Sequence, residues 1–269
     1  MRHSFTGKNV LITGGASGIG KIMLRKALER KADNVVIWDI NGQGMEAVRQ
    51  EFGLLGAIHT ITVDLSDIES IQNAVTATQQ RITHIDILIN NAGIIIGKYF
   101  HEHSSDEITD TIHINTSAVM YTTHAFLPLM MKRNTGAICN IASSAGIIAN
   151  PKMSVYAASK WAVVGWSDSL RLEMKQLSKN ISVTTIMPYY INTGMFDGVQ
   201  SKLLPILKPE PTAERIIRAV ERGKSLYAIP LSYRFIRFSQ GLLPLCLFDW
   251  VMKNVFGIYD TMTHFKGRK

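Results

Sequence analysis

The chain has 269 residues, and 46% of them are hydrophobic, which is typical of a globular protein and excludes a largely disordered chain. Lysine and arginine outnumber aspartate and glutamate by 29 to 21, a formal net charge of +8. Most of the excess lies in residues 201–269, with 12 basic and 5 acidic residues. No nucleic-acid-binding motif accompanies these charges, so we expect no nucleic-acid partner.

The cysteines and the apolar runs indicate a cellular compartment. Cys139 and Cys246 lie in apolar segments and are expected to be buried, reduced thiols, since two cysteines cannot form a disulfide framework. The first strongly apolar run, Val10–Ile12, is too short for a secretory signal. No uninterrupted apolar run approaches the roughly 20 residues of a membrane-spanning helix. We therefore expect a cytoplasmic protein.

Residues 8–187 alternate short β-rich segments with longer segments of helical periodicity, and several of the β-rich segments are apolar almost throughout. This pattern predicts an α/β fold with one doubly wound parallel sheet and helices on both faces. We expect a single domain over residues 1–269. The predicted strands are Asn9–Ile12, Asn34–Trp38, Ile58–Val63, Ile85–Ile89, Ala137–Ile141, Ser182–Ile186 and Leu226–Ile229.

The remaining elements are less regular. A long helix is predicted over residues 106–133, with a kink at Pro128. Residues 190–211 are rich in proline and are predicted to form a substrate loop, after which Thr212 is expected to cap a helix. Residues 231–269 form an apolar and basic C-terminal extension.

A glycine-rich loop follows the first predicted strand, in the sequence Thr13-Gly14-Gly15-Ala16-Ser17-Gly18-Ile19-Gly20, and a helix follows directly. Glycines allow a tight turn close to a pyrophosphate, and the helix N-terminus presents free N–H groups to it. In this position the loop indicates a Rossmann-type dinucleotide site.

The second predicted strand leads into Asp39, 19 residues after Gly20. A carboxylate there can accept hydrogen bonds from the adenosine ribose and would repel a 2′-phosphate. No lysine or arginine lies at 15–17 or 40–42, so we predict NAD(H) rather than NADP(H) as cofactor. The alternative is that Asp39 is an ordinary turn residue.

Tyr156 and Lys160 are four residues apart in a predicted helix, which places them on one face. The ammonium group, together with an oxidised nicotinamide, is expected to lower the phenol pKa so that Tyr156 can act as an acid or base near neutral pH. Ser143 follows the predicted strand Ala137–Ile141, where its hydroxyl could orient a substrate oxygen. Alone, such a pair is usually an exposed helix face, and such a serine usually caps a turn.

Together these motifs resemble the compact short-chain dehydrogenase/reductases, over about residues 5–230. The resemblance implies that Asn115, Ser143, Tyr156 and Lys160 are catalytic, with Asn115 holding a water of the proton relay. It implies that the family's long helix, here 106–133, forms a homodimer or homotetramer interface. The cofactor-binding residues that we predict are Gly14, Ser17, Gly18, Ile19, Gly20, Asp39, Asp64, Leu65, Asn91, Ala92, Gly93, Tyr156, Lys160, Pro188 and Thr193.

One departure from the family concerns the substrate site. The family usually has glycine after the proline at 188, whereas this chain has Tyr189 and Tyr190. These rings either form an apolar wall or simply pack the loop, and Ile94–Ile96 bring further apolar bulk. The segments 192–196 and 260–268 resemble the branch of retinol and 17β-hydroxysteroid dehydrogenases, which implies a lipophilic alcohol or carbonyl substrate. Membrane-bound members of that branch carry an N-terminal anchor, which we do not expect here.

The C-terminal extension contains an apolar ridge over residues 235–252, among the basic residues Arg234, Arg237 and Lys253. Basic residues beside tryptophan and phenylalanine are typical of a helix lying in a membrane interface. The alternative is a helix that packs over the substrate cleft or against a partner subunit, and Pro244 favours it by breaking the helix.

We expect no metal site, because His101 and His103 lack a third ligand and a suitable spacing. The sequence therefore predicts an NAD-dependent oxidoreductase acting on an apolar small molecule. The alternatives are a 3-oxoacyl or other small-carbonyl reductase, a sugar-nucleotide epimerase, and a non-catalytic NAD-binding module.

Overall fold

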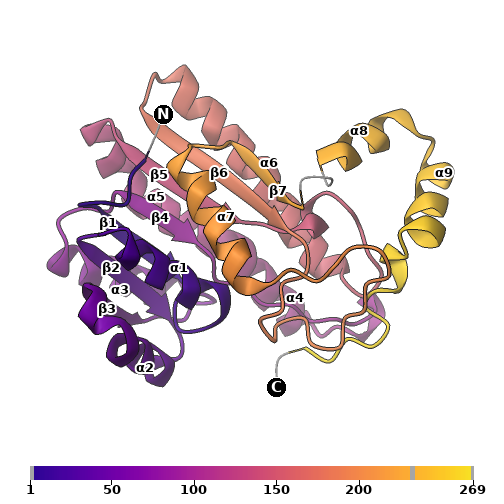
Figure 1. Ribbon diagram of the computed structural model, residues 1–269, viewed down its shortest axis with the longest axis horizontal. Coiled ribbons are helices and arrows are strands. Elements are labelled where there is room, and N and C mark those ends of the chain that lie inside the picture. Colours follow the sequence, from indigo (N-terminus) through magenta and orange to yellow (C-terminus); the bar gives the residue numbers. More distant parts are fainter. Residues whose placement is uncertain (1–2, 231–233, 268–269) are drawn as a thin grey trace.

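The structure is a computed structural model that describes residues 3–230 and 234–267. A seven-stranded, wholly parallel sheet with the order β3-β2-β1-β4-β5-β6-β7 forms its centre (Figure 1). The predicted doubly wound fold is thereby confirmed, with strand ends shifted by one or two residues. The strands are β1 (Asn9–Thr13), β2 (Asn34–Asp39), β3 (Ala57–Thr62), β4 (Ile87–Asn90), β5 (Gly136–Ile141), β6 (Ile181–Pro188) and β7 (Leu226–Ile229).

Helices cover both faces of the sheet. On one face, α1 (Gly18–Glu29), α2 (Gly42–Phe52) and α7 (Pro209–Glu221) bury their apolar sides against the strands. On the other face lie α3 (Ile68–Arg81), α5 (Ala118–Arg133) and α6 (Ser154–Gln176), with α4 (Ser105–Ile112) packed against α6. Burial of the strands on both sides explains why most of them are apolar at every position.

A third apolar cluster lies beyond the carboxyl ends of β5 and β6. It joins Tyr156 of α6 to Tyr189 and Tyr190, and to Phe248 and Met252 of the C-terminal segment. That segment comprises α8 (Arg234–Leu242), α9 (Leu245–Trp250) and a π-helical turn (Val251–Val255). Pro244 separates α8 from α9, as its ring and missing N–H require. The predicted extension begins at 231, and residues 231–233 lie outside the described part.

The start of α7 corrects a prediction. Thr212 does not cap this helix, because α7 begins at Pro209 and Thr212 lies inside it. The Thr212 hydroxyl donates to the carbonyl oxygen of Lys208, 2.7 Å away. Proline is well suited to the first position of a helix, since its φ is already helical and no N–H partner is needed there. Pro209 therefore starts the helix three residues earlier.

The predicted helix 106–133 also differs from expectation. It begins at Ser105 and contains a π-helical turn over His113–Ser117, between α4 and α5. Such turns recur at functional sites, and this one carries Asn115. Pro128 lies inside α5.

The two cysteines differ from each other. Cys139 of β5 is buried as expected, whereas Cys246 of α9 is exposed. The prediction of a buried Cys246 is wrong because α9 packs only one of its sides against the rest of the protein. Within the described residues, none of the helices combines the length and apolar character needed to span a membrane.

Candidate active site

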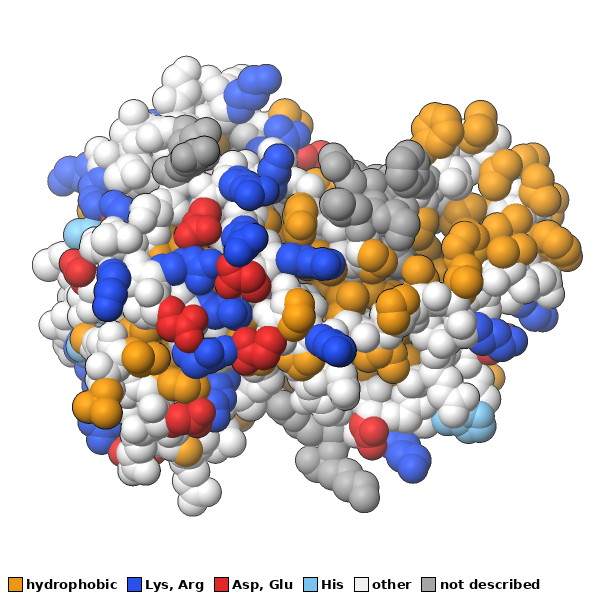
Figure 2. All heavy atoms as spheres, viewed as in Figure 1, with side chains coloured by type: hydrophobic (Ala, Val, Ile, Leu, Met, Phe, Trp, Pro, Cys, Tyr) orange, Lys and Arg blue, Asp and Glu red, His pale blue; other side chains and the backbone are white. Residues whose placement is uncertain are grey.

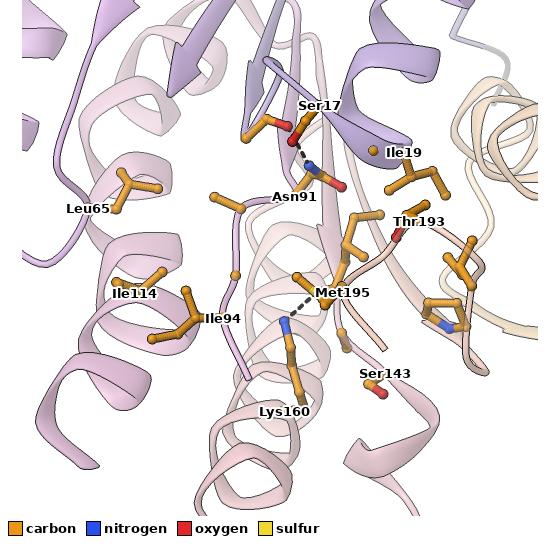
Figure 3. Close-up of a pocket in the computed structure, with 18 of the residues that line it drawn as sticks. Ser17, Ile19, Leu65, Asn91, Ile94, Ile114, Ser143, Lys160, Thr193 and Met195 are labelled. Carbon is orange, nitrogen blue, oxygen red and sulfur yellow. Dashed lines mark hydrogen bonds between the residues drawn. The ribbon is translucent and has the colours of Figure 1, made fainter. Parts of the chain in front are cut away.

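A cavity of about 280 Å³ lies at the carboxyl edge of the sheet. Residues from the ends of six strands line it, as expected where the strand order reverses between β1 and β4. Figure 3 shows Ser17 and Asn91 at one end and Lys160 and Ser143 at the other. Ile94 and Met195 lie between the two ends.

The glycine-rich loop forms one side of this cavity, and its backbone leaves no room for side chains. Gly14 and Gly18 have positive φ values of 69° and 56°, a conformation that favours glycine. A Cβ on Gly20 would lie 2.0 Å from the Gly14 carbonyl oxygen. The first turn of α1 therefore faces the cavity at Gly18 and Ile19, and its N–H groups and dipole suit a phosphate group. This cradle fits the pyrophosphate of a dinucleotide.

Two carboxylates line the far end of the cavity. Asp39 accepts hydrogen bonds from the backbone N–H groups of Ala16 (2.9 Å) and Asn41 (3.0 Å), so it also holds the glycine-rich loop. Asp64 accepts from the N–H and the hydroxyl of Ser66 through Oδ1. Among the described lining residues, the only lysine or arginine is Lys160.

Hydrogen bonds join the end of β4 to the end of β1. The Asn91 amide donates to the carbonyl oxygens of Thr13 (2.9 Å) and Gly14 (3.1 Å). The Thr13 hydroxyl accepts from the backbone N–H groups of Asn91 and Ala92. These bonds fix the relative height of the two loops that face the cavity.

Ser143, Tyr156 and Lys160 meet at the other end. The Ser143 side chain lies close enough to the Tyr156 phenol to oppose the rise in its pKa, and the Lys160 Nζ lies 5.7 Å from the centre of the Tyr156 ring. Lys160 donates to the carbonyl oxygen of Ile141 at the end of β5 (3.0 Å). Ser143 also accepts from the Ala145 N–H, so it caps a turn while facing the cavity.

The pKa values of this group depend chiefly on burial. Burial raises the pKa of Tyr156 to about 12, and the hydrogen bond from Ser143 opposes this only in part. Burial lowers the pKa of Lys160 to about 8, because the charged ammonium loses its hydration. The protein groups therefore raise the pKa of the Tyr156 phenol, whereas we expected from the sequence that it would be lowered.

Asn115 lies beneath the cavity rather than in it. It is fully buried, and its amide oxygen accepts from the Ile94 N–H (2.8 Å). Its amide nitrogen donates to the Ile94 carbonyl oxygen (2.9 Å) and to the Ser159 hydroxyl (3.1 Å). The π-helical turn brings this side chain to the backbone that follows β4, so Asn115 positions the wall formed by Ile94.

The two tyrosines after Pro188 both pack the loop and line the cavity. Tyr190 lies 4.6 Å from Tyr189 and 4.9 Å from Phe196, measured between ring centres. The Tyr190 hydroxyl is hydrogen-bonded to Asn150 (3.0 Å) and to Thr261 in the C-terminal tail (3.0 Å). The two alternatives left open by the sequence therefore both hold.

The structure brings almost all of the predicted site residues into one cavity. Gly20 and Asn115 do not line it, since Gly20 packs against the loop backbone and Asn115 supports Ile94. Two supporting residues were not predicted, namely Asn150 and Thr261. They are 111 positions apart in the chain, and no local pattern connects them.

A doubly wound parallel sheet with a glycine cradle and a Tyr–Lys helix pair at its carboxyl edge defines a dinucleotide-binding oxidoreductase. The sequence profile described as short chain dehydrogenase matches residues 8–203, which is more than half of the chain. The protein belongs to the short chain dehydrogenase family.

Two relatives illustrate the branch. Estradiol 17-beta-dehydrogenase 11 of Pongo abelii is 35% identical over 245 residues, covering 90% of this chain and 81% of that protein. Human epidermal retinol dehydrogenase 2 is 33% identical over 274 residues, covering 100% of this chain and 88% of that protein. Both similarities confirm the branch that the sequence motifs indicated.

Solved structures show the same fold. A short-chain dehydrogenase from Sphingobium yanoikuyae in complex with NADPH has a TM-score of 0.76 and 27% identity, covering 87% of this chain and 94% of that one. A short chain dehydrogenase/reductase from Burkholderia phymatum in complex with NAD has a TM-score of 0.80 and 21% identity, covering 89% and 96%. The two solved proteins hold different nicotinamide cofactors, NADPH in one and NAD in the other.

The buried Lys160 makes stability depend on pH. Its pKa is about 8 in the folded chain and 10.5 when unperturbed, so below pH 8 the folded state carries a desolvated ammonium at full cost. That cost disappears as the pH rises from 8 to 10.5. At about pH 7.5 we expect Lys160→Met to be more stable than the wild type by up to about 3 kcal/mol, and this gain to shrink towards pH 10. Urea unfolding of both proteins without added cofactor measures it.

The control is Lys175→Met on the exposed side of the same helix, which should change the unfolding free energy by less than about 0.5 kcal/mol at each pH. The pH stays below about 10, where the unfolded tyrosines begin to ionise. A stability difference between wild type and Lys160→Met that does not change with pH would contradict the lowered pKa of Lys160 in the folded protein.

Proposed function

We propose that this protein transfers a hydride between NAD(H) and the hydroxyl- or carbonyl-bearing carbon of a lipophilic substrate. The observation that carries the proposal is the joining of Ser143, Tyr156 and Lys160 to the glycine cradle in one cavity with largely apolar walls. We further propose that residues 1–269 act as one catalytic domain, in which residues 190–211 form the substrate loop. Ile191, Thr193, Met195 and Phe196 of that loop line the cavity.

The cofactor, when bound, accepts or supplies the hydride. We propose that Gly14, Ser17, Gly18 and Ile19 hold its pyrophosphate, and that Asn91, Ala92, Gly93, Pro188 and Thr193 line its nicotinamide half. The backbone near Gly93 comes close to the catalytic end, since a Cβ there would lie 3.4 Å from the Lys160 Nζ. Lys160 would thus hold the nicotinamide ribose as well as act on Tyr156.

The proton moves at Tyr156. For alcohol oxidation, the Tyr156 oxygen takes the hydroxyl proton of the substrate while the hydride leaves the adjacent carbon, and for carbonyl reduction it returns that proton. Ser143 donates or accepts a hydrogen bond at the substrate oxygen and limits its movement. A phenol whose pKa burial raises is a poor base by itself, so positive charge at Lys160 and at the nicotinamide must favour the phenolate. We propose that Asn115 and the π-helical turn that carries it would hold a water of the proton relay.

The walls of the cavity favour an apolar substrate. Ile94, Met195 and Phe196 line it near Tyr156, and the Phe196 ring meets the Tyr156 ring edge-on at 6.2 Å. The relatives named as acting on estradiol and retinol support the same substrate class. A small-carbonyl reductase on the same fold would need a more polar wall.

We propose NAD(H) as the cofactor because of the carboxylates at its adenosine end. Asp39 and Asp64 face that end, and no described lysine or arginine lines it to compensate a 2′-phosphate. Asp39 keeps its carboxylate in place through two backbone N–H groups, so the charge cannot easily turn away. The NADPH complex of a relative makes this a point to measure.

We also propose that the protein forms a homodimer or homotetramer. We propose in addition that it is cytoplasmic and binds peripherally to membrane surfaces. Tyr121 and Leu129 of α5 and Trp161 and Leu172 of α6 are exposed large hydrophobic residues, which supports an interface on these two helices.

Tyr156→Phe tests the proposed acid/base. We expect kcat to fall by about 10²- to 10⁴-fold, since the ring remains and only the transferable proton is lost. The dissociation constant of NADH, measured by fluorescence titration, should change less than about twofold. Tyr227→Phe, in β7 outside the cavity, is the matched control and should keep near-normal turnover. A Tyr156→Phe variant with wild-type kcat would rule out the assignment.

Asp39→Asn tests the cofactor preference. The wild type should bind NADH more tightly than NADPH, and the variant should bind NADPH about tenfold more tightly than the wild type, because the negative charge that repels a 2′-phosphate is removed. Glu46→Gln, which changes a carboxylate of α2 that does not line the cavity, should leave both dissociation constants unchanged. Tighter NADPH than NADH binding by the wild type would disprove NAD preference.

A panel of alcohols tests the substrate class. We expect NAD⁺ reduction, followed by near-ultraviolet absorbance, to become more efficient from short alkanols through octanol to retinol and hydroxysteroids, because burial of each added methylene is favourable. Activity confined to small polar compounds would favour the small-carbonyl reductase. No turnover with any compound would favour a non-catalytic NAD-binding module.

A further inference from the structure

The C-terminal helices expose an unusual amount of apolar surface. Six large side chains of α8, α9 and the following π-helical turn are at least 45% exposed, and we call them the α8–α9 face. They are Phe238 (68%), Leu242 (67%), Leu245 (74%), Leu247 (45%), Trp250 (57%) and Val255 (52%). Figure 2 shows hydrophobic side chains gathered over these helices, and Figure 1 shows both helices projecting from the body. Soluble monomers rarely expose so many adjacent apolar side chains without a binding role.

The opposite side of the same helices is already packed. Ile236, Leu243, Phe248 and Met252 belong to the apolar cluster that contains Tyr156 and Tyr190. The Gln240 amide donates to the Ile147 carbonyl oxygen (2.7 Å), in the turn that follows Ser143. The α8–α9 segment is therefore apolar on two sides. Among the described residues, other parts of the protein cover only the side that faces the catalytic cavity. An apolar side of a helix that the rest of the protein leaves exposed requires an apolar neighbour of its own.

Charge indicates what kind of neighbour fits. The sequence from 234 to 256 contains three basic residues, Arg234, Arg237 and Lys253, and one acidic residue, Asp249. The Asp249 carboxylate accepts a hydrogen bond from the Tyr259 hydroxyl (2.5 Å), which uses it inside the molecule. Lys253 is exposed between Trp250 and Val255, and no described carboxylate forms an ion pair with it.

A second copy of this chain fits the face less well. A twofold interface places the same patch on both subunits, so the exposed Lys253 side chains of both copies would border one apolar contact. An anionic lipid surface offers an apolar interior for the exposed side chains and negative headgroups for the basic ones. Tryptophan and phenylalanine beside lysine and arginine are the side chains that interfacial helices use.

We propose that the α8–α9 face docks this protein on an anionic lipid surface. Docking there would place the lipid against helices whose inner side packs beside Tyr156 and Tyr190, so that an apolar alcohol dissolved in the bilayer lies close to the cavity. This last part rests on the proposed function. The docking itself does not, since it follows from the exposed apolar face and its charge.

Cosedimentation with vesicles tests the docking without any turnover. The probes are vesicles of phosphatidylcholine alone, and of phosphatidylcholine with about one quarter phosphatidylglycerol, at about 50 mM NaCl. We expect the full-length protein to bind the anionic vesicles at least about tenfold more tightly than the neutral ones. The double variant Phe238→Ser/Trp250→Ser should lose at least about tenfold of this binding. Lys253→Glu should lose severalfold on anionic vesicles only.

The matched control is Leu54→Ser/Leu177→Ser, which removes two exposed leucines away from the α8–α9 face and should bind as the wild type does. All variants alter exposed positions, and thermal unfolding midpoints within about 3 °C of the wild type would show that they fold. Sedimentation velocity without lipid is run in parallel.

Three results would overturn the proposal. These are no binding of the wild type to anionic vesicles, equal binding by the double variant, and self-association of the wild type that the double variant abolishes in place of vesicle binding. The alcohol panel is run without lipid, so a failure of the docking leaves the oxidoreductase proposal standing. Conversely, vesicle binding without turnover would support the docking alone.

Discussion

The site depends on one set of hydrogen bonds, between Asn91 at the end of β4 and Thr13 and Gly14 at the end of β1. These strands are neighbours in the sheet although β1 ends at Thr13 and β4 begins only at Ile87, and their connections leave in opposite directions. The sheet therefore leaves a crevice at its carboxyl edge between these two strands, where a ligand can bind. The Asn91 amide holds the glycine-rich loop against the second strand end, so the cradle and the Tyr156 end belong to one cavity.

The balance between burial and charge governs the catalytic end. Both Tyr156 and Lys160 are buried, and burial favours the neutral form of each. The same burial strengthens any charge that does form nearby, because little water remains to screen it. The Tyr156 phenol, which keeps its proton at neutral pH in the protein alone, can thus lose it much more readily when a positive charge lies beside it. Its reactivity therefore depends on the charges present in the site.

Much of the fold and most of the cavity lining could be predicted from the sequence, because they depend on local patterns. Apolar strands, the glycine-rich loop and the Tyr156–Lys160 spacing are all contained in short segments. Contacts between distant segments could not be predicted, such as Asn150 with Thr261, or the bond between Asn115 and Ile94. Thr212 misled because a better helix start, Pro209, precedes it, and Cys246 because apolar neighbours do not imply burial on a helix with an exposed side.

The bond between Tyr190 and Thr261 has a consequence for how the protein is made. All seven strands end by residue 229, so the sheet contains no residue of the segment that carries Thr261, and it can form before that segment has left the ribosome. The Tyr190 hydroxyl can bond to Asn150 before then, but it gains its second partner, Thr261, only when that residue emerges. A nascent chain can therefore complete its nucleotide-binding frame before its substrate pocket, and a chain cut before Thr261 would have a complete sheet with an unfinished pocket.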